Sequence, residues 1–259
     1  MNKIDWETTF YETAGKYRVP AVPNLADGYN QGSGIKRNSE MKLMLKRAAW
    51  IPLKLRNDLM VDGFIEWEVG KLIKKYITTK SVFLEIGCGD MSLRKYLPSN
   101  IWYNALDLEI ADFHIVTALK STQKINLVVA SAVEIPALPD IASLIVSTET
   151  FEHIPEIDRA IEEIYRVATP DATLICSIPN NYCYKYKKKG PHSDHINNWE
   201  YNEFIEYMKA HHFEFVEGFM KGRWIPIPSW ITKTSYQLPF SSKTEYYNTN
   251  FFYVFRARK

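Results

Sequence analysis

The sequence has few features of secreted, membrane-spanning or disulfide-bonded proteins. Its three cysteines, Cys88, Cys176 and Cys183, are an odd number without metal-ligand spacing, which disfavours a disulfide framework. No stretch reaches the roughly 18 uncharged apolar residues of a membrane span, and the N-terminus lacks the apolar core of a signal peptide. We therefore expect a cytoplasmic protein with no membrane partner.

The sequence also lacks a strong net charge. It has 32 basic and 30 acidic residues, a balance of +2 that does not by itself indicate a nucleic acid or an anionic membrane as partner. One local exception is the basic run Lys185–Lys189, which is interpreted as a solvated loop or as a phosphate-binding patch. With 259 residues, the chain can form one α/β domain with extensions.

Strand-like and helix-like segments alternate beyond residue 60. Amphipathic spacing predicts helices over 61–77 and between Pro155 and Pro170, with Pro170-Asp171 as the turn into the next strand. Such alternation builds a mainly parallel sheet with helices on both faces, and ligands bind at the carboxyl ends of its strands. Strands are predicted at 82–86, 102–107, 126–130, 142–148, 172–178, 213–219 and 250–257.

The most informative stretch is 82–90, where a β-forming run leads through Glu85 into a Gly-x-Gly turn. Because glycine has no Cβ, Gly87 and Gly89 let the backbone approach a ligand closely. A dinucleotide fingerprint would need a third glycine at position 92, which is Ser. The carboxylates of Glu85 and Asp107 favour a cationic ligand over a pyrophosphate. S-adenosylmethionine, a sulfonium with a ribose diol, meets that demand.

From this loop onward the chain resembles the class I S-adenosylmethionine-dependent methyltransferases of the small-molecule type, the methyltransferase domain 11 group. The resemblance covers roughly residues 65–220 and implies a Rossmann-like α/β fold with seven strands, the last antiparallel. It rests on the Glu85–Gly89 loop and on four further segments, which are Asp107, 131–136, 147–154 and 178–180.

The resemblance also implies the cofactor and its contacts. Asp107, at the end of the second strand, is predicted to accept both ribose hydroxyls, and Glu85 to order the loop near the sulfonium. Ser131 stands where the family pattern often has an Asp, which puts a side-chain contact to adenine in doubt. The residues predicted to bind S-adenosylmethionine are Glu85, Gly87, Cys88, Gly89, Asp107, Leu108, Ala132, Val133, Thr148 and Glu149.

Three histidines are candidates for the base that removes a proton from a hydroxyl acceptor. His153 follows the fourth strand, and His192 and His195 follow the fifth, all near the expected methyl position. A structural role for His153 is the alternative. The loop histidines with Asp194 could instead bind a metal, but without a third defined ligand position we predict no metal site.

Two segments fall outside the resemblance. Residues 1–60 are predicted to be an N-terminal extension, either a lid over the cofactor or a cover for apolar sheet surface. Residues 61–259 form the predicted methyltransferase domain, with an aromatic insert near 220–240 that often shapes the acceptor pocket in such enzymes.

The acceptor remains open at this point. The absence of a broad basic face and of an Asn-Pro-Pro-Tyr strand end disfavours DNA and RNA bases. O-methylation of a small polar metabolite, such as a sugar, sugar nucleotide or phosphorylated precursor of a surface polysaccharide, is the main hypothesis. The alternatives are an RNA (tRNA) methyltransferase docking through residues 42–56, and a non-catalytic S-adenosylmethionine-binding protein.

Overall fold

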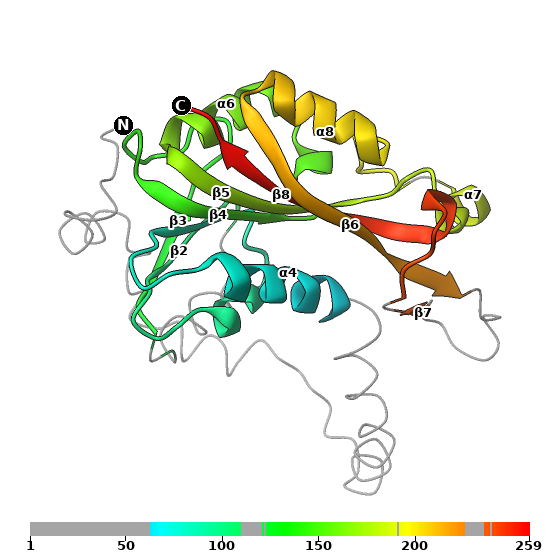
Figure 1. Cartoon of the computed structure of the whole chain (residues 1–259), viewed down its shortest axis with the longest axis horizontal. Helices are drawn as coiled ribbons and strands as arrows, with labels where there is room; N and C mark the ends of the chain where they lie inside the picture. Colours follow the sequence, from blue (N-terminus) through cyan, green and yellow to red (C-terminus); the bar gives the residue numbers. More distant parts are fainter. Residues whose placement is uncertain (1–62, 110–120, 122, 191, 226–235, 239) are drawn as a thin grey trace, which may run out of the picture.

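The structure, a computed structural model, describes residues 63–109, 121, 123–190, 192–225, 236–238 and 240–259 (Figure 1). The predicted extension over residues 1–60 lies outside the described residues. None of the helices in the described part of the chain has both the length and the apolar character that a membrane span requires.

One sheet organises the described residues. Its strands lie in the order β3-β2-β1-β4-β5-β8-β6-β7, and the first five of these run parallel. The strand β8 pairs antiparallel with both β5 and β6. The strands are β1 (Phe83–Ile86), β2 (Tyr103–Asp107), β3 (Ile125–Val129), β4 (Ala142–Thr148), β5 (Ala168–Pro179), β6 (Phe213–Ile225), β7 (Tyr236–Leu238) and β8 (Asn248–Ala257).

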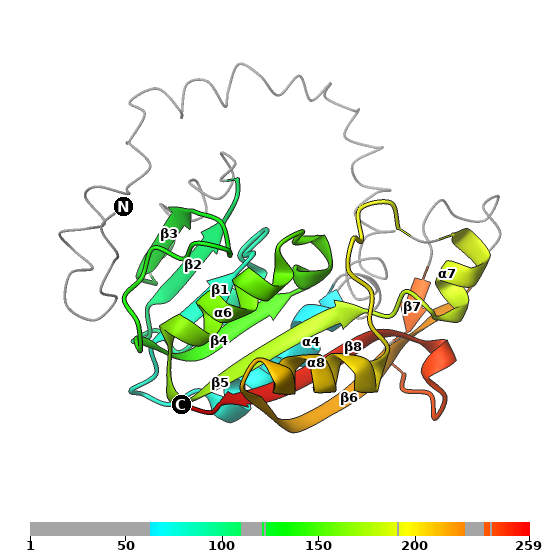
Figure 2. The same ribbon diagram turned by 90° about the horizontal axis from the view of Figure 1, so that it is seen from above.

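Helices cover both faces of the sheet. In Figure 1, α4 lies on one face and α6 and α8 lie on the other, and Figure 2 shows the second face from above. The α-helices are α4 (Gly63–Tyr76), α6 (Ile157–Val167), α7 (Tyr184–Lys189) and α8 (Tyr201–Ala210), and the 3₁₀ turns are η1 (Ser92–Tyr96), η2 (Phe151–His153) and η3 (Glu245–Tyr247). This arrangement confirms the predicted Rossmann-like α/β class with an antiparallel last strand.

Two details differ from the sequence prediction. The short strand β7 adds an eighth strand by pairing with residues 223–225 of β6, inside the predicted aromatic insert. Pro170 and Asp171, predicted as a turn, lie within the long strand β5, where Asp171 has φ +59°. There the register with β4 shifts between Ala142 and Leu144. A bulge therefore replaces the turn, because β5 begins directly where α6 ends.

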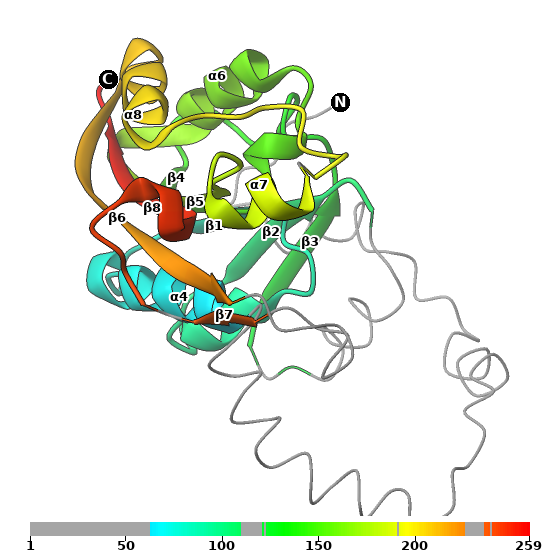
Figure 3. The same ribbon diagram turned by 90° about the vertical axis from the view of Figure 1, so that its right-hand side faces the viewer.

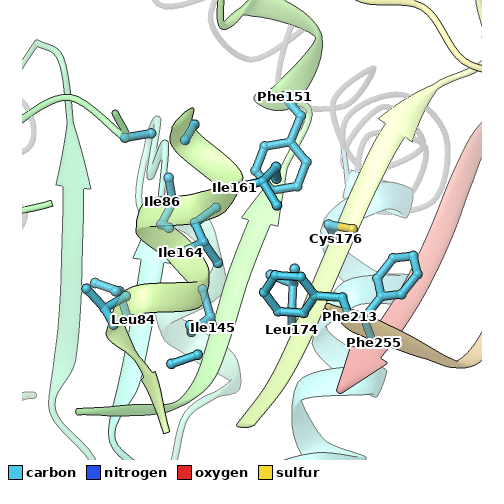
Figure 4. Packing of buried hydrophobic residues seen from close by; sticks show 14 of the residues in the cluster. Leu84, Ile86, Ile145, Phe151, Ile161, Ile164, Leu174, Cys176, Phe213 and Phe255 are labelled. Atoms are coloured by element: carbon cyan, nitrogen blue, oxygen red, sulfur yellow. The ribbon is translucent and has the colours of Figure 1, made fainter. Parts of the chain in front are cut away.

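Two apolar cores lie on opposite sides of the sheet because side chains alternate along each strand. On one side, Leu84 and Ile86 of β1 pack in a cluster with Ile161 and Ile164 of α6 (Figure 4). On the other side, Phe83 packs in a cluster with residues of α4. The helix α6 has the spacing for this because its buried residues Ile157, Ala160, Ile161, Ile164 and Val167 form one helical face.

Candidate cofactor and acceptor site

A pocket of about 540 Å³ opens at the carboxyl ends of β1, β2 and β4. This volume lies within the range of small-molecule sites, and the position is the one at which open parallel sheets bind ligands. All ten residues predicted to bind the cofactor border this pocket, together with Ile65 and Glu66 of α4 and Thr150, His153 and Pro155 after β4. The structure thus brings together segments that are up to 90 residues apart in the sequence.

The glycine turn after β1 leaves its backbone next to the pocket. The N–H of Gly87 and the N–H of Cys88 donate to the carbonyl of Leu106, at 2.9 and 3.3 Å. Gly87 has φ +71°, and a Cβ there would lie 2.4 Å from Thr150 Oγ1. Gly89 has φ +46°, and a Cβ there would meet no described atom within 4 Å. Glycine is therefore required at position 87 for packing, whereas a Cβ at position 89 would clash with no described atom, and the role of Gly89 beside a ligand stays a prediction.

Cys88, between the two glycines, is buried. Burial raises the pKa of its thiol well above the ordinary range, so the thiol stays protonated and its reactivity is low. Its side chain packs in the apolar cluster that includes Phe83 and Met91.

Asp107 lies at the end of β2 with its carboxylate beside the glycine turn. Its Oδ2 accepts from the N–H of Gly89 at 3.0 Å, and its Oδ1 accepts from the N–H of Glu109 at 3.3 Å. Each carboxylate oxygen can accept more than one hydrogen bond, so both remain able to receive a hydroxyl. This geometry is compatible with the predicted ribose contact, which stays a prediction.

Glu85 is buried at the inner wall of the pocket, where it is 1% exposed. Its carboxyl accepts from the hydroxyl of Tyr103 at 2.5 Å. Burial raises the pKa of Glu85 to about 8, and the bond from Tyr103 opposes this only in part. Because ionisation of a buried carboxyl has a desolvation cost, Glu85 carries less negative charge in the pocket without ligand than the sequence analysis assumed.

Glu149 closes β4 in a left-handed conformation with φ +48°. Its Oε1 accepts from Ser177 Oγ at 2.9 Å and its Oε2 accepts from Asn250 Nδ2 at 3.0 Å. The carboxylate is thus fixed to β5 and β8. An L-residue at positive φ costs of order 1–3 kcal/mol, and these two bonds help to hold it. Glu149 and Thr148 together form a rigid base of the pocket.

The three candidate histidines lie in one cluster next to this base. The ring of His195 stacks on His192 with 4.5 Å between centroids and meets His153 edge-on at 5.0 Å. Of the three, only His153 is among the residues that border the pocket. His192 and His195 lie behind it, so the structure brings the three rings together but exposes one of them to the pocket.

The segment carrying His192 and His195 is held on η2 by its backbone and by Asn197. The N–H groups of Ile196 and Asn197 donate to the carbonyl of Glu152 at 2.8 and 3.1 Å. Asn197 Nδ2 donates to the carbonyls of Phe151 and Ile154 at 2.9 and 2.7 Å. The histidines are therefore in a preformed arrangement. Nothing in the sequence spacing pointed to Asn197.

The hydrogen bonds of the imidazoles define their tautomers. His153 Nδ1 donates to the carbonyl of Asp194 at 2.8 Å, because a carbonyl can only accept. His195 Nδ1 donates to Asn181 Oδ1 at 2.7 Å, because the amide nitrogen of Asn181 donates to Asn198. In the neutral form of each ring, Nε2 is therefore the nitrogen without a proton. Burial, followed by the charges of the neighbouring histidines, lowers the pKa of His195 to about 4.

Glu152 is the acidic residue that the sequence prediction did not assign. It is 1% exposed, its Oε1 lies 3.7 Å from His153 Nε2, and its Oε2 has no hydrogen-bond partner among the described residues. Burial, followed by the charge of the neighbouring Glu149 carboxylate, raises the pKa of Glu152 to about 9. The only signal for Glu152 in the sequence was its place directly before His153.

The basic run was predicted to be a loop and is a helix, but Lys187 and Lys188 are exposed, as a solvated segment requires. Tyr184–Lys189 is α7, which lies beyond β5 at the end of the sheet seen in Figure 3. Lys185 lies over the ring of Tyr186, and Lys187 lies over Tyr246 at 5.1 Å. Tyr186 in turn meets His195 at 6.0 Å between centroids. Cations and aromatic rings thus continue outward from the histidine cluster.

Comparison with known families supports a methyl-transfer assignment for this pocket. A family model described as a methyltransferase domain matches residues 84–176, which include the glycine turn, Asp107 and the segment after β4. Comparison with curated proteins returns no match.

Solved structures share the fold at low sequence identity. The YcgJ protein from Bacillus subtilis is 12% identical with a TM-score of 0.58, covering 74% of this chain and 99% of its own. An S-adenosylmethionine-dependent methyltransferase from Methanosarcina mazei is 15% identical with a TM-score of 0.54, covering 72% and 97%. The 1,6-didemethyltoxoflavin-N1-methyltransferase of Burkholderia thailandensis, with its substrate and S-adenosylhomocysteine bound, is 14% identical with a TM-score of 0.55, covering 96% and 91%.

The two loop glycines give a first prediction. Gly87→Ala should lower the melting temperature strongly, because the methyl group meets Thr150 and the residue keeps a positive φ, a strain of roughly 1–3 kcal/mol by itself. Gly89→Ala should lose less stability but bind S-adenosylmethionine more weakly, because its Cβ projects into the ligand space. Thermal denaturation and titration calorimetry measure both effects.

Gly190→Ala is the matched control, since φ is +86° there and no described atom lies within 4 Å. Normal affinity of Gly89→Ala would contradict this role.

A second prediction concerns Asp107. Asp107→Ala should weaken the binding of S-adenosylmethionine by about 1–3 kcal/mol, because the ribose hydroxyls would lose a partly buried acceptor. Asp107→Asn keeps an acceptor for the N–H of Gly89 and should lose less. Glu109→Ala, which alters an exposed side chain one position beyond Leu108, is the control. Equal dissociation constants for Asp107→Ala and the unmodified protein would refute the ribose contact.

A third prediction follows from the buried carboxyl of Glu85. Its pKa rises from 4.5 in the unfolded chain to about 8 in the folded one, so the folded state binds more protons between these values. The free energy of unfolding without cofactor should therefore fall as the pH rises from 5 to 8, by several kcal/mol at about 1.4 kcal/mol per pKa unit. Glu85→Gln should flatten this slope in urea denaturation, while Glu134→Gln, at an exposed position, should not. An unchanged slope in Glu85→Gln would exclude this origin.

Proposed function

Since this chain is an S-adenosylmethionine-dependent methyltransferase with the class I fold, we propose that it methylates an oxygen atom of a small polar metabolite. The observation that carries the proposal is the histidine cluster at the base of the cofactor pocket. A hydroxyl acceptor has to lose a proton during methyl transfer, and imidazole is the commonest group for that task.

The chemistry divides between two parts of the pocket. S-adenosylmethionine supplies an electrophilic methyl group on a sulfonium. The glycine turn and Asp107 hold the cofactor, and the rigid base at Thr148 and Glu149 limits where its methyl end can lie. The acceptor oxygen approaches in line with the methyl–sulfur bond, which breaks as the new carbon–oxygen bond forms. The histidine cluster receives the hydroxyl proton, and S-adenosylhomocysteine leaves as the neutral thioether.

The acceptor class rests on what surrounds the cluster. The rings of Tyr184, Tyr186 and Tyr246 and the cations of Lys185 and Lys187 lie beyond His195. Aromatic faces suit sugar or base rings, and ammonium groups suit phosphate. A sugar, a sugar nucleotide or a phosphorylated precursor of a surface polysaccharide fits these groups. The Burkholderia enzyme, whose name gives a small heterocycle as substrate, supports a small acceptor in this fold, although it acts on nitrogen.

Two alternatives remain distinguishable. An RNA (tRNA) methyltransferase would dock through the basic run at 42–56, which lies outside the described residues. A non-catalytic protein would bind the cofactor at the same glycine turn without transferring its methyl group. Neither alternative uses a cluster of imidazoles with bare Nε2 atoms next to the pocket, and this favours the O-methyltransferase.

A fourth prediction tests the acceptor directly. With methyl-labelled S-adenosylmethionine, label should enter a pool of sugar nucleotides or phosphorylated sugars, as an O-methyl group identified by mass spectrometry and NMR. It should not enter tRNA. Transfer of label to tRNA alone would contradict the small-metabolite proposal. Cofactor binding by calorimetry without transfer to any pool would favour the non-catalytic alternative.

The cluster itself can be tested in the same assay. At least one of His153→Asn, His192→Asn and His195→Asn should lower the single-turnover rate by about 10²-fold or more with an unchanged dissociation constant for the cofactor. His211→Asn, a substitution at the end of α8, is the control. Normal rates in all three cluster variants would exclude the histidines, and a carboxylate such as Glu149 would then be the candidate.

A further inference from the structure

The carboxyl of Glu152 and the imidazoles of His153 and His195 converge behind the base of the pocket. One ligand atom from each lies within 4.8 Å of the other two, and Glu152 Oε1 lies 3.7 Å from His153 Nε2. We propose that these three side chains bind a divalent transition metal ion, Zn²⁺ in the first place, with an open coordination position towards the pocket. Two histidines and one glutamate with a fourth position for an exchangeable oxygen are a known catalytic zinc set.

The outer hydrogen bonds are those that a metal site requires. A metal-binding imidazole usually donates its other N–H to an oxygen acceptor, which fixes the tautomer and turns the ring. Both rings satisfy this condition, through the carbonyl of Asp194 for His153 and through Asn181 for His195. Asn181 is itself held by Asn198. In the neutral ring each Nε2 is therefore the nitrogen left to bind a metal, and that of His153 lies 3.7 Å from Glu152 Oε1.

Glu152 supplies the charge that the two neutral imidazoles lack. An ionised carboxylate that is buried without a partner is expensive, and a buried charge is normally paired or bound to a metal. Glu152 is 1% exposed, and the described residues offer its Oε2 no donor. A divalent cation between this carboxylate and the two Nε2 atoms would satisfy it.

The backbone holds the ligands in nearly the right place. Glu152 and His153 are neighbours in η2, and His195 is brought to them by the bonds from Ile196 and Asn197 to the carbonyl of Glu152. Ligands of a tetrahedral zinc lie roughly 3.4 Å apart, and the three ligand atoms lie within 4.8 Å of one another, so binding would shorten the widest separation by at most about 1.4 Å. The ring of His195 is stacked but not enclosed, which leaves it free to make this small movement.

This inference rests on the proposed O-methyltransferase function and changes how the cluster works, because a nitrogen that binds the metal cannot also accept the hydroxyl proton. That proton would go to His192, the imidazole of the cluster outside the metal set, which stacks on His195. Because His153 borders the pocket, an acceptor hydroxyl that occupies the open position would be oriented towards the methyl group. The inference also replaces the sequence prediction of no metal site. That prediction depended on the lack of a third ligand in the histidine loop, and Glu152 supplies the ligand from the segment after β4.

Metal binding can be measured without any acceptor. The full chain, stripped with a chelator and dialysed, should take up one Zn²⁺ per chain by calorimetry and elemental analysis. Co²⁺ should give the visible absorption of a tetrahedral site. Glu152→Gln and His195→Asn should each lose this binding, and Asn181→Ala should weaken it by roughly 10–100-fold, the usual effect of removing an outer hydrogen bond. Circular dichroism establishes that each variant is folded.

The control is His212→Asn, because His212 is exposed, lies outside the cluster and has φ +67°, which Asn tolerates. It should bind Zn²⁺ as the unmodified chain does. The inference is overturned if the chain binds no Zn²⁺ at micromolar concentration, or if Glu152→Gln and His195→Asn bind it normally. O-methylation that persists in chelator while the histidine variants are inactive would leave the proposed function standing and remove the metal. Zn²⁺ binding without O-methyl products would support the metal site and contradict the proposed O-methylation.

Discussion

The site depends on the close approach of the two turns that follow β1 and β4. The carbonyl of Ile86 accepts from Ser147 Oγ at 3.1 Å and from Thr150 Oγ1 at 3.4 Å, so the end of one strand is tied to the end of the other. Thr150 then fills the space where any side chain at position 87 would project. Because this contact joins the glycine turn to the segment leading into η2, it sets the distance between the cofactor half of the pocket and the histidine half.

Much of the scaffold could be predicted because its signals are local. All seven predicted strands are present, five of them within two residues of their predicted ends, and the apolar face of α6 matches its spacing. The strand β5 begins four residues before its predicted start, and β6 continues six residues past its predicted end. The strand β7 and the bulge at Asp171 escaped prediction for a physical reason. A three-residue strand has too little pattern to be recognised, and a bulge depends on how β5 must reach β4 from the end of α6.

The sequence predicted which residues around the glycine turn border the pocket, but it did not predict how the histidines are arranged. Glycines and an acidic strand end have a fixed spacing along the chain, so Gly87, Gly89 and Asp107 could be read directly. The histidines could be named, but their mutual contact depends on Asn197 and on backbone bonds across about 40 residues. Burial is likewise a tertiary property. It makes Glu85 and Glu152 retain protons to a higher pH than ordinary carboxyls, and sequence spacing does not reveal burial.

Three carboxyls that are wholly or partly buried around one pocket give it a common electrostatic character. Glu85 lies on β1, whereas Glu149 and Glu152 follow β4. Glu85 accepts a hydrogen bond from a tyrosine hydroxyl, Glu149 accepts from donors on β5 and β8, and Oε2 of Glu152 has no donor among the described residues. A pocket of this kind favours ligands that bring positive charge, because cation binding offsets the desolvation of the carboxylates. The sulfonium predicted near Glu85 and the divalent cation proposed beside Glu152 would both meet this electrostatic demand, and the segment between Glu149 and His153 would separate them.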